Sequence, residues 1–213
     1  MPDWLPSPAV LAAFTPAVVL LTLTPGPDMT LFIGKTLGQD RRAGLAAWAG
    51  AATGLVVHAL FAAFGLSALL AASPNAFSAV KIAGALYLVW LAIGAIRHGS
   101  AFVAGRNDAR SPHLRIYATG LGINLLNPKI ILFFVTFLPQ FVSPNDPYAA
   151  SKLFFLGVSF ILIAAPICFG LIAFADQVAL RVRRSPRILR AIDYAFAGVM
   201  GAFALRLLVT RNG

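Results

Sequence analysis

Residues 8–34 have the sequence PAVLAAFTPAVVLLTLTPGPDMTLFIG, a long apolar segment interrupted near its end by two prolines that flank a glycine. A helix of about 20 apolar residues is long enough to cross the hydrocarbon core of a bilayer. Pro25 and Pro27 lack a backbone N–H, and each disfavours the helical conformation at the residue before it. The segment therefore predicts a membrane helix that ends at Thr24-Pro25-Gly26-Pro27 and starts again directly afterwards.

The composition of the whole chain agrees with a membrane protein. Hydrophobic residues make up 59% of the 213 positions, charged residues make up 11%, and the mean hydropathy is +0.83. Soluble domains have about 25% charged residues, and disordered chains combine low hydrophobicity with high charge, so both classes are excluded. The single cysteine, Cys168, excludes a disulfide-linked scaffold. The chain is therefore expected to be an integral membrane protein.

Runs with few charges divide the sequence into six predicted spans. Their apolar stretches are continuous over about 20 residues, whereas the strands of membrane barrels alternate over about 10, so the spans are predicted to be α-helices. They lie near 8–34, 43–71, 79–97, 116–141, 151–175 and 191–210. The sequence thus predicts an all-α integral membrane protein with six transmembrane helices in a single membrane domain, residues 1–213.

Basic residues are distributed unevenly over the connecting segments. The segments after the first, third and fifth spans hold twelve Lys and Arg residues, and the opposite side holds four. Cytoplasmic segments of membrane proteins are enriched in Lys and Arg, so both termini are predicted to lie outside the cytoplasm. The net charge of +10 is attributed to these segments rather than to nucleic-acid binding, because no nucleic-acid-binding motif accompanies it. The basic segments Arg106–Arg115 and Arg181–Arg190 could contact anionic lipids.

A second break is predicted in the fourth span, at Asn124-Leu125-Leu126-Asn127-Pro128-Lys129. Asn127-Pro128 has the form of a helix N-cap followed by proline at the first helical position, as does Thr24-Pro25. Halves of about 1–105 and 106–213 would each hold three spans, an odd number, so they would be inverted relative to each other across the membrane. Paired breaks in corresponding spans of inverted repeats indicate a transporter site. The alternative is that these prolines only kink two membrane helices.

Three motifs give the chain a resemblance to a known family. They are TPGPDM at 24–29, KIAGALYLVWL at 81–91, and NLLNPK at 124–129 followed by FLPQF at 137–141. In order, spacing and total length they resemble the LysE/RhtB family of amino-acid exporters. The resemblance implies a six-helix protein of the bacterial inner membrane that exports amino acids or their derivatives, with efflux coupled to the proton gradient. Some members carry Asn at the position of Asp28, so the acid is not universal there.

Asp28 and Lys129 are the charged residues predicted to lie deep within spans. An ionisable residue inside the membrane marks a functional site by default. Asp28 could bind a substrate ammonium or carry the coupled proton, or it could only favour the start of a half-helix. Lys129 could attract a substrate carboxylate or pair with Asp28, or it could extend its long side chain to the nearer aqueous side.

The remaining candidate residues surround the two breaks. Thr24, Pro25, Gly26, Pro27, Asn124, Asn127 and Pro128 are predicted to form the substrate site with Asp28 and Lys129. Half-helix N-termini bind carboxylates, although the asparagines could serve only as caps and interhelical hydrogen-bond partners. His58 could relay protons or simply bond between helices, and Tyr87 could line the pathway or pack in the core.

Other features are assigned structural roles. Trp48 is predicted to anchor the membrane interface, Cys168 to fill apolar space, and the small residues Gly50 and Gly54 to pack against another helix or to form a homodimer contact. Three scattered histidines and one cysteine do not form a metal site, and no cofactor is expected. The rival functions are an exporter of another small solute or cation, an intramembrane enzyme and an assembly subunit. An enzyme would need a convergent catalytic set, which the sequence does not offer.

Overall fold

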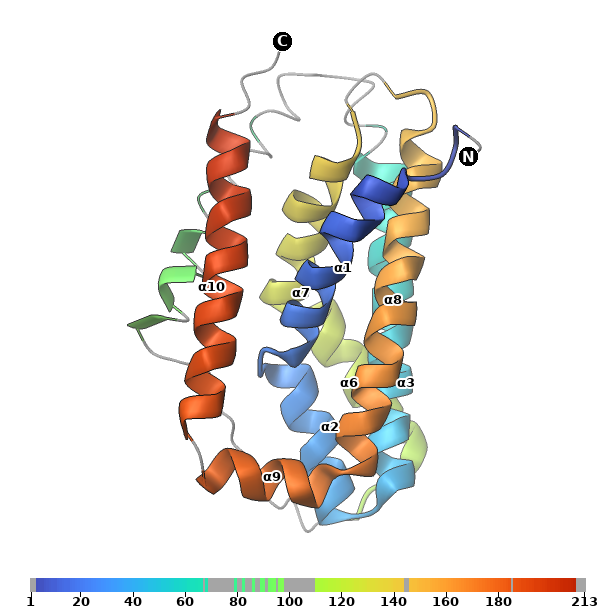
Figure 1. Ribbon diagram of the computed structural model, residues 1–213. Coiled ribbons are helices and arrows are strands. Elements are labelled where there is room, and N and C mark those ends of the chain that lie inside the picture. The colour runs from blue at the N-terminus through green and yellow to red at the C-terminus, as the bar shows by residue number, and fades with distance from the viewer. Residues whose placement is uncertain are drawn as a thin grey trace.

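The computed structural model describes residues 3–66, 110–143, 146–184 and 186–209, together with isolated positions between 68 and 97. Every regular element in the four continuous ranges is helical, which confirms the all-α prediction. The predicted third span, 79–97, and with it Tyr87, lies largely outside the described residues. Figure 1 shows the helices as a bundle with both termini at one end.

The first predicted break is confirmed. Helix α1 (Pro8–Leu23) starts at Ser7, whose hydroxyl accepts a hydrogen bond from the Val10 N–H. Helix α2 (Pro27–Gly38) follows at an angle of 52° to α1. The chain is extended at Thr24 and Gly26, because Pro25 and Pro27 cannot continue the hydrogen-bond pattern of α1.

The second span is formed by α3 (Arg41–Leu60), continued by a turn of π-helix, η1 (Phe61–Leu66). The Asp40 carboxylate caps α3 by accepting from the Ala43 N–H. Helix α6 (His113–Leu125) packs closely along α3. A Cβ on Gly50 would overlap the Tyr117 carbonyl of α6, so this small residue serves packing within the chain.

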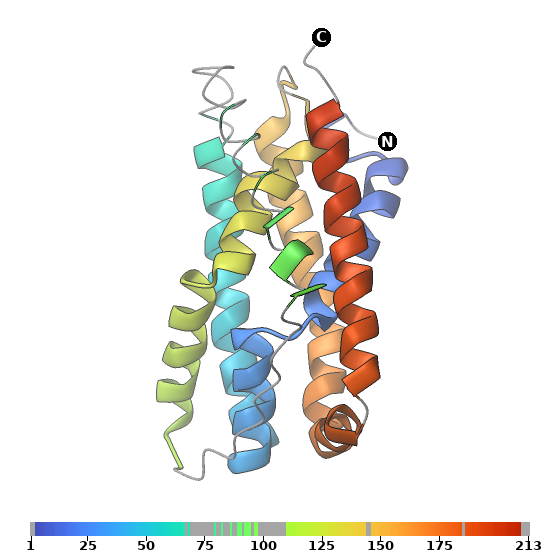
Figure 2. The ribbon, with the colours of Figure 1, turned by 90° about the vertical axis from the view of Figure 1, so that its left-hand side faces the viewer.

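The second predicted break is also confirmed. After α6, the helix starts again as α7 (Pro128–Leu132) and continues through the π-helical turn η2 (Phe133–Phe137) and the 3-10 turn η3 (Leu138–Phe141). The two halves of this span are bent by 50°. The first broken span runs away from the end that holds the termini and the second runs back toward it (Figures 1 and 2).

The C-terminal part contains α8 (Ala149–Ala173), α9 (Ala175–Arg184) and α10 (Pro186–Val209). The basic segment predicted at Arg181–Arg190 is helical where the structure describes it, since its residues belong to the end of α9 and the start of α10. Ala175 and Ala179, one helical turn apart, are buried, so α9 is an amphipathic helix with a buried face. It lies across the end of the bundle opposite the termini (Figure 1).

Length and composition identify the described helices that could span a membrane. Arg41–Leu66 and Ala149–Ala173 each suffice alone, and the two bent pairs raise the number to four if each pair counts as one span. The largest core cluster among the described residues joins α1, η2 and α8 through aromatic rings. The ring of Phe133 in η2 lies at centroid distances of 6.0 Å from Phe14 in α1 and 5.1 Å from Phe160 in α8. This cluster lies beside the two breaks and fixes the helices that carry them.

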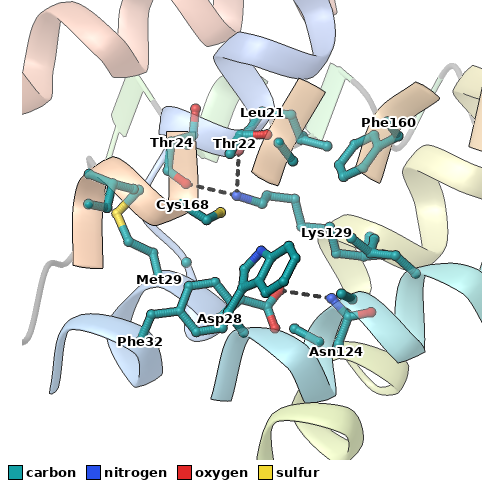
Figure 3. A pocket seen from close by; sticks show the side chains of 18 residues that line it. Leu21, Thr22, Thr24, Asp28, Met29, Phe32, Asn124, Lys129, Phe160 and Cys168 are labelled. Atoms are coloured by element: carbon teal, nitrogen blue, oxygen red, sulfur yellow. Dashed lines mark hydrogen bonds between the residues drawn. The ribbon is translucent and has the colours of Figure 1, made fainter. Parts of the chain in front are cut away.

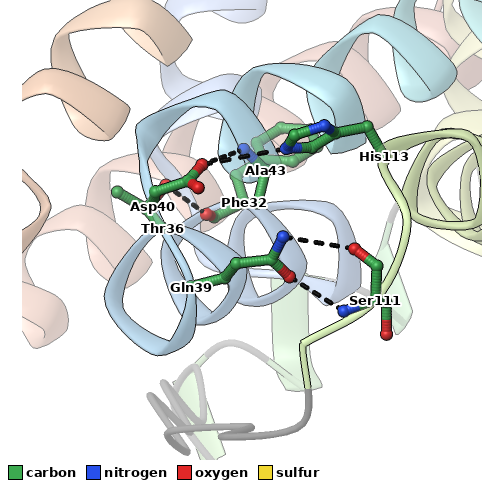
Figure 4. A network of polar contacts seen from close by, with 7 residues as sticks. All are labelled: Phe32, Thr36, Gln39, Asp40, Ala43, Ser111 and His113. Carbon is green, nitrogen blue, oxygen red and sulfur yellow. Dashed lines mark hydrogen bonds and ion pairs between the residues drawn. The ribbon is translucent and has the colours of Figure 1, made fainter.

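A polar contact joins two connecting segments at the end opposite the termini. The Gln39 amide donates to the Ser111 carbonyl at 3.2 Å and accepts from the Ser111 N–H at 3.0 Å. His113 lies 3.9 Å from the Asp40 carboxylate (Figure 4). The turn between α2 and α3 is thus fastened to the start of α6, so the basic segments around them share one end of the bundle.

Candidate functional site

The two breaks meet in the middle of the bundle. Asp28, in the first turn of α2, accepts a hydrogen bond of 2.7 Å on Oδ2 from Asn127 Nδ2. The same oxygen accepts from Asn124 Nδ2 at 3.3 Å. The structure therefore brings the acid of the first break together with both asparagines of the second.

Asn127 has two functions at once. Its Oδ1 accepts from the Lys129 N–H at 3.0 Å and caps α7, as the Asn-Pro sequence predicts. Its Nδ2 is left to donate to Asp28. A single side chain therefore both starts one half-helix and binds the acid at the start of the other.

Lys129 contacts the end of α1. Its Nζ donates to the Leu21 carbonyl at 3.0 Å and to the Thr24 carbonyl at 2.8 Å. The Leu21 carbonyl would normally accept from the N–H four residues later, but that residue is Pro25, which has none. The ammonium of Lys129 thus replaces the missing donor, and its side chain turns inward instead of extending to solvent.

Gly26 makes room for this ammonium. A Cβ at that position would lie 3.3 Å from Lys129 Nζ and 3.6 Å from its Cε. Gly26 is extended, with a φ of −162°, so its lack of a side chain serves the close approach of Lys129 rather than an unusual backbone conformation.

Two oxygens at this junction have no hydrogen-bond partner in the part of the chain that the structure describes. They are Asp28 Oδ1 and Asn124 Oδ1, and both are buried. Asn124 Oδ1 faces the backbone of α3, because a Cβ on Gly54 would lie 2.6 Å from it. Buried polar atoms are rarely left unpaired in a native structure, so such atoms at a cavity indicate a place for a ligand or water.

A cavity with about 560 Å³ of empty space, part of it open to solvent, lies at the junction. Figure 3 shows Lys129 reaching across it, with Met29, Phe32 and Cys168 to one side and Phe160 to the other. Its lining includes five polar residues, Thr22, Thr24, Asp28, Asn124 and Lys129, and Gly26. Its apolar lining comes from α1, α2, α3, α7 and α8.

Other predicted site residues lie at or beyond the edge of this cavity. Asn127 donates to Asp28 but does not itself line the cavity. His58 Nε2 lies 3.3 Å from the Asn124 carbonyl, and its ring lies 5.6 Å from that of Phe134. His58 therefore contacts Asn124 but does not line the cavity. Among the residues that the structure describes, no group of three or more His, Cys, Asp or Glu side chains could hold a metal ion.

Sequence reasoning missed several residues of the cavity. Trp48 lines it although an interface position was expected, and Cys168 lines it although only apolar packing was expected. For Trp48 and Cys168, the only sequence signal was membership of an apolar helix, which does not distinguish a cavity wall from a packed core.

Known proteins resemble this chain over most of its length. The homoserine/homoserine lactone efflux protein of Salmonella typhimurium is 31% identical over 180 residues, which cover 84% of this chain and 86% of that relative. The leucine efflux protein of Klebsiella pneumoniae is 30% identical over 196 residues, with coverages of 91% and 92%. An uncharacterized membrane protein of Vibrio cholerae is 33% identical over 190 residues, with coverages of 89% and 92%.

No solved structure matches the chain. The family model for LysE type translocators matches residues 19–211, a range that contains both breaks and every residue of the cavity's polar lining. The chain therefore belongs to the LysE type translocator family and is a membrane transporter rather than an enzyme.

Proposed function

We propose that the protein exports amino acids or amino-acid derivatives across the bacterial inner membrane through the cavity between the two breaks. Its family and the efflux proteins of homoserine and leucine among its relatives support this direction and substrate class. The observation that carries the proposal is the buried, unpartnered Oδ1 of Asp28 in the same cavity as the Lys129 ammonium.

The two charges complement a zwitterion. Asp28 Oδ1 is free to accept from a substrate ammonium, while Oδ2 is held by Asn127 and Asn124. Lys129 Nζ has three donors and gives two of them to carbonyls, so one remains for a substrate carboxylate. Charge-assisted hydrogen bonds of this kind are about twice as strong as neutral ones.

In the proposed architecture, six spans form two inverted three-helix repeats with the site at their interface. The two broken spans support it, because they run in opposite directions and bend by similar angles, 52° and 50°. Transport would rock one half against the other, as inverted-repeat transporters do. The contacts of Asp28 and Lys129 across the two breaks are the ones that such a motion would change.

Orientation and coupling complete the proposal. The end with the α2–α3 turn and α9 carries the basic residues and would face the cytoplasm, with both termini outside. The proton gradient would drive efflux. Asp28, whose Oδ1 has no partner among the described residues, is the group best placed to bind the substrate ammonium.

The test is reconstitution of the purified protein into proteoliposomes loaded with each of the twenty amino acids. Efflux is measured with and without an imposed pH gradient, against liposomes without protein. Export of at least one amino acid, accelerated by the gradient, is the expected result. Failure to export any of the twenty, or homoserine tested in the same way, would contradict the proposed substrate class. Efflux indifferent to the gradient would contradict the coupling.

A further inference from the structure

The polar groups of the cavity are confined to the breaks, and the rest of its wall is apolar. Met29 and Phe32 come from α2, Trp48 and Leu55 from α3, and Leu171 from α8. These side chains continue the wall from the first turn of α2, where Asp28 lies, so a molecule bound by Asp28 would be surrounded by hydrocarbon.

The apolar wall is held in place. The ring of Trp48 meets that of Phe169 edge-on at a centroid distance of 4.5 Å. Leu171 packs against the cluster of Met29, Ile33 and Ala175. Because these contacts restrain the side chains, the wall presents a preformed apolar surface instead of one that closes on itself when empty.

The charges of the cavity are balanced by one pair. Asp28 is the one carboxylate and Lys129 the one ammonium in the lining that the structure describes. A bound zwitterion would engage each of them once. A second cationic group on the substrate would find no further carboxylate and would lie close to Lys129, and a second anionic group would compete with the substrate's own carboxylate for the single free donor of Lys129.

We infer that the transported substrates are neutral amino acids with aliphatic or aromatic side chains, and that lysine, arginine, aspartate and glutamate are poor substrates. This inference rests on the proposed zwitterion site and adds the side-chain specificity. Each methylene group moved from water into an apolar wall favours binding by about fourfold. Leucine is therefore bound more tightly than alanine by about tenfold or more.

The first test measures competition in proteoliposomes. Exchange of radiolabelled leucine is recorded while unlabelled amino acids are added in turn. We expect isoleucine, methionine and phenylalanine to inhibit at concentrations at least about tenfold lower than lysine, arginine or glutamate do. If several amino acids are exported but lysine competes as well as leucine, the specificity is wrong and the zwitterion site stands. If no amino acid is exported, the proposed function itself fails.

The second test adds a carboxylate to the apolar wall. Leu171→Asp supplies a partner for a cationic side chain, and Leu171→Asn has nearly the same size without the charge. We expect Leu171→Asp, but not Leu171→Asn, to raise the ratio of lysine to leucine export by about tenfold. An equal ratio in both variants, at membrane levels matched to the wild type, would mean that Leu171 does not face the substrate side chain and would overturn this placement. Met29→Glu, compared with Met29→Gln, repeats the measurement if the Leu171 variants do not reach the membrane.

Discussion

Asn127 Nδ2 lies 2.7 Å from Asp28 Oδ2, so the residue that starts the second half of one broken span holds the acid at the start of the other. Lys129, two residues after Asn127, forms a second connection between the breaks. Its Nζ donates to the Leu21 and Thr24 carbonyls at the end of α1. Each break therefore supplies the polar partners that the other lacks. This reciprocity explains how irregular backbone is tolerated at membrane depth, since its polar groups are satisfied inside the protein.

Asp28→Asn separates substrate binding from a structural role. The asparagine amide oxygen can still accept from Asn124 and Asn127, but the neutral side chain cannot form a charge-assisted bond with an ammonium. We expect the KM for amino-acid export to rise by about tenfold or more, corresponding to about 1.5–3 kcal/mol, while pH-gradient coupling is retained. Asp176→Asn, at an exposed position of α9, is the matched control and should behave as the wild type. An unchanged KM in Asp28→Asn would reduce Asp28 to a structural role.

Asn127 allows its two functions to be separated. Asn127→Ser keeps an N-cap oxygen for α7 but removes the donor to Asp28, whereas Asn127→Ala removes both. We expect both variants to transport poorly. Only Asn127→Ala should lose the additional stability of a cap, about 1 kcal/mol, measured by thermal unfolding in detergent. Normal transport by Asn127→Ser would show that the bond to Asp28 is not needed at the site.

Much of this site could be predicted from the sequence, because its chemistry is local. Proline removes a donor wherever it stands, so Pro25 and Pro128 fixed both breaks before any tertiary contact was known. An ionisable residue in an apolar run, such as Asp28 or Lys129, is equally conspicuous. The sequence could not provide the partner of each group, because the hydrogen bond from Lys129 to the Leu21 carbonyl depends on how the two breaks are brought together in space.

The apolar wall and α9 were missed for a different reason. Trp48 lies on a helix that is apolar on most sides, so its pattern does not reveal which side faces the cavity. The basic residues of α9 indicated a connecting segment, but Ala175 and Ala179, one helical turn apart, are buried, which gives this segment a helix with an apolar face. The weak apolar periodicity of α3 and the short length of α9 prevent the sequence pattern from showing which face of each helix is buried.

The orientation can be tested by labelling single cysteines in intact cells. In a Cys168→Ala background with verified transport, cysteine at Ser111 or Arg187 should resist a membrane-impermeant thiol reagent, because both positions belong to the basic end of the bundle. Cysteine at Ser143, between η3 and α8 at the opposite end, should react. Reaction at Ser111 with protection at Ser143 would invert the topology.

The segment before α8 predicts a pH-dependent contribution to stability. Burial alone would raise the pKa of the Asp146 carboxyl, but hydrogen bonds from Lys152 Nζ and the Tyr148 N–H outweigh burial and lower the pKa. The ionised carboxylate therefore stabilises the fold above the pKa of the unfolded chain, about 4, and this contribution is lost as the pH falls through the lower folded-state value.

The difference in Tm between the wild type and Asp146→Asn should accordingly be largest near pH 7 and shrink toward pH 3. Asp3→Asn, at an exposed position near the N-terminus, is the control and should show no such trend. A difference that is constant over this pH range would mean that the carboxylate of Asp146 does not contribute through its charge.

Gly54 and Gly122 provide a matched pair for the role of Asn124. A Cβ on Gly54 would lie 2.6 Å from Asn124 Oδ1 and 3.0 Å from its Cβ, so Gly54→Ala must displace this asparagine, which donates to Asp28. A Cβ on Gly122, in α6 two residues before Asn124, would meet no atom within 4 Å. Alanine is favoured over glycine in a helix by about 1 kcal/mol, so Gly122→Ala should be neutral or slightly stabilising.

We expect Gly54→Ala to raise the KM for export and Gly122→Ala to leave it unchanged, measured in proteoliposomes at equal protein density. Equal KM values in the two variants would mean that the position of Asn124 does not matter to the substrate.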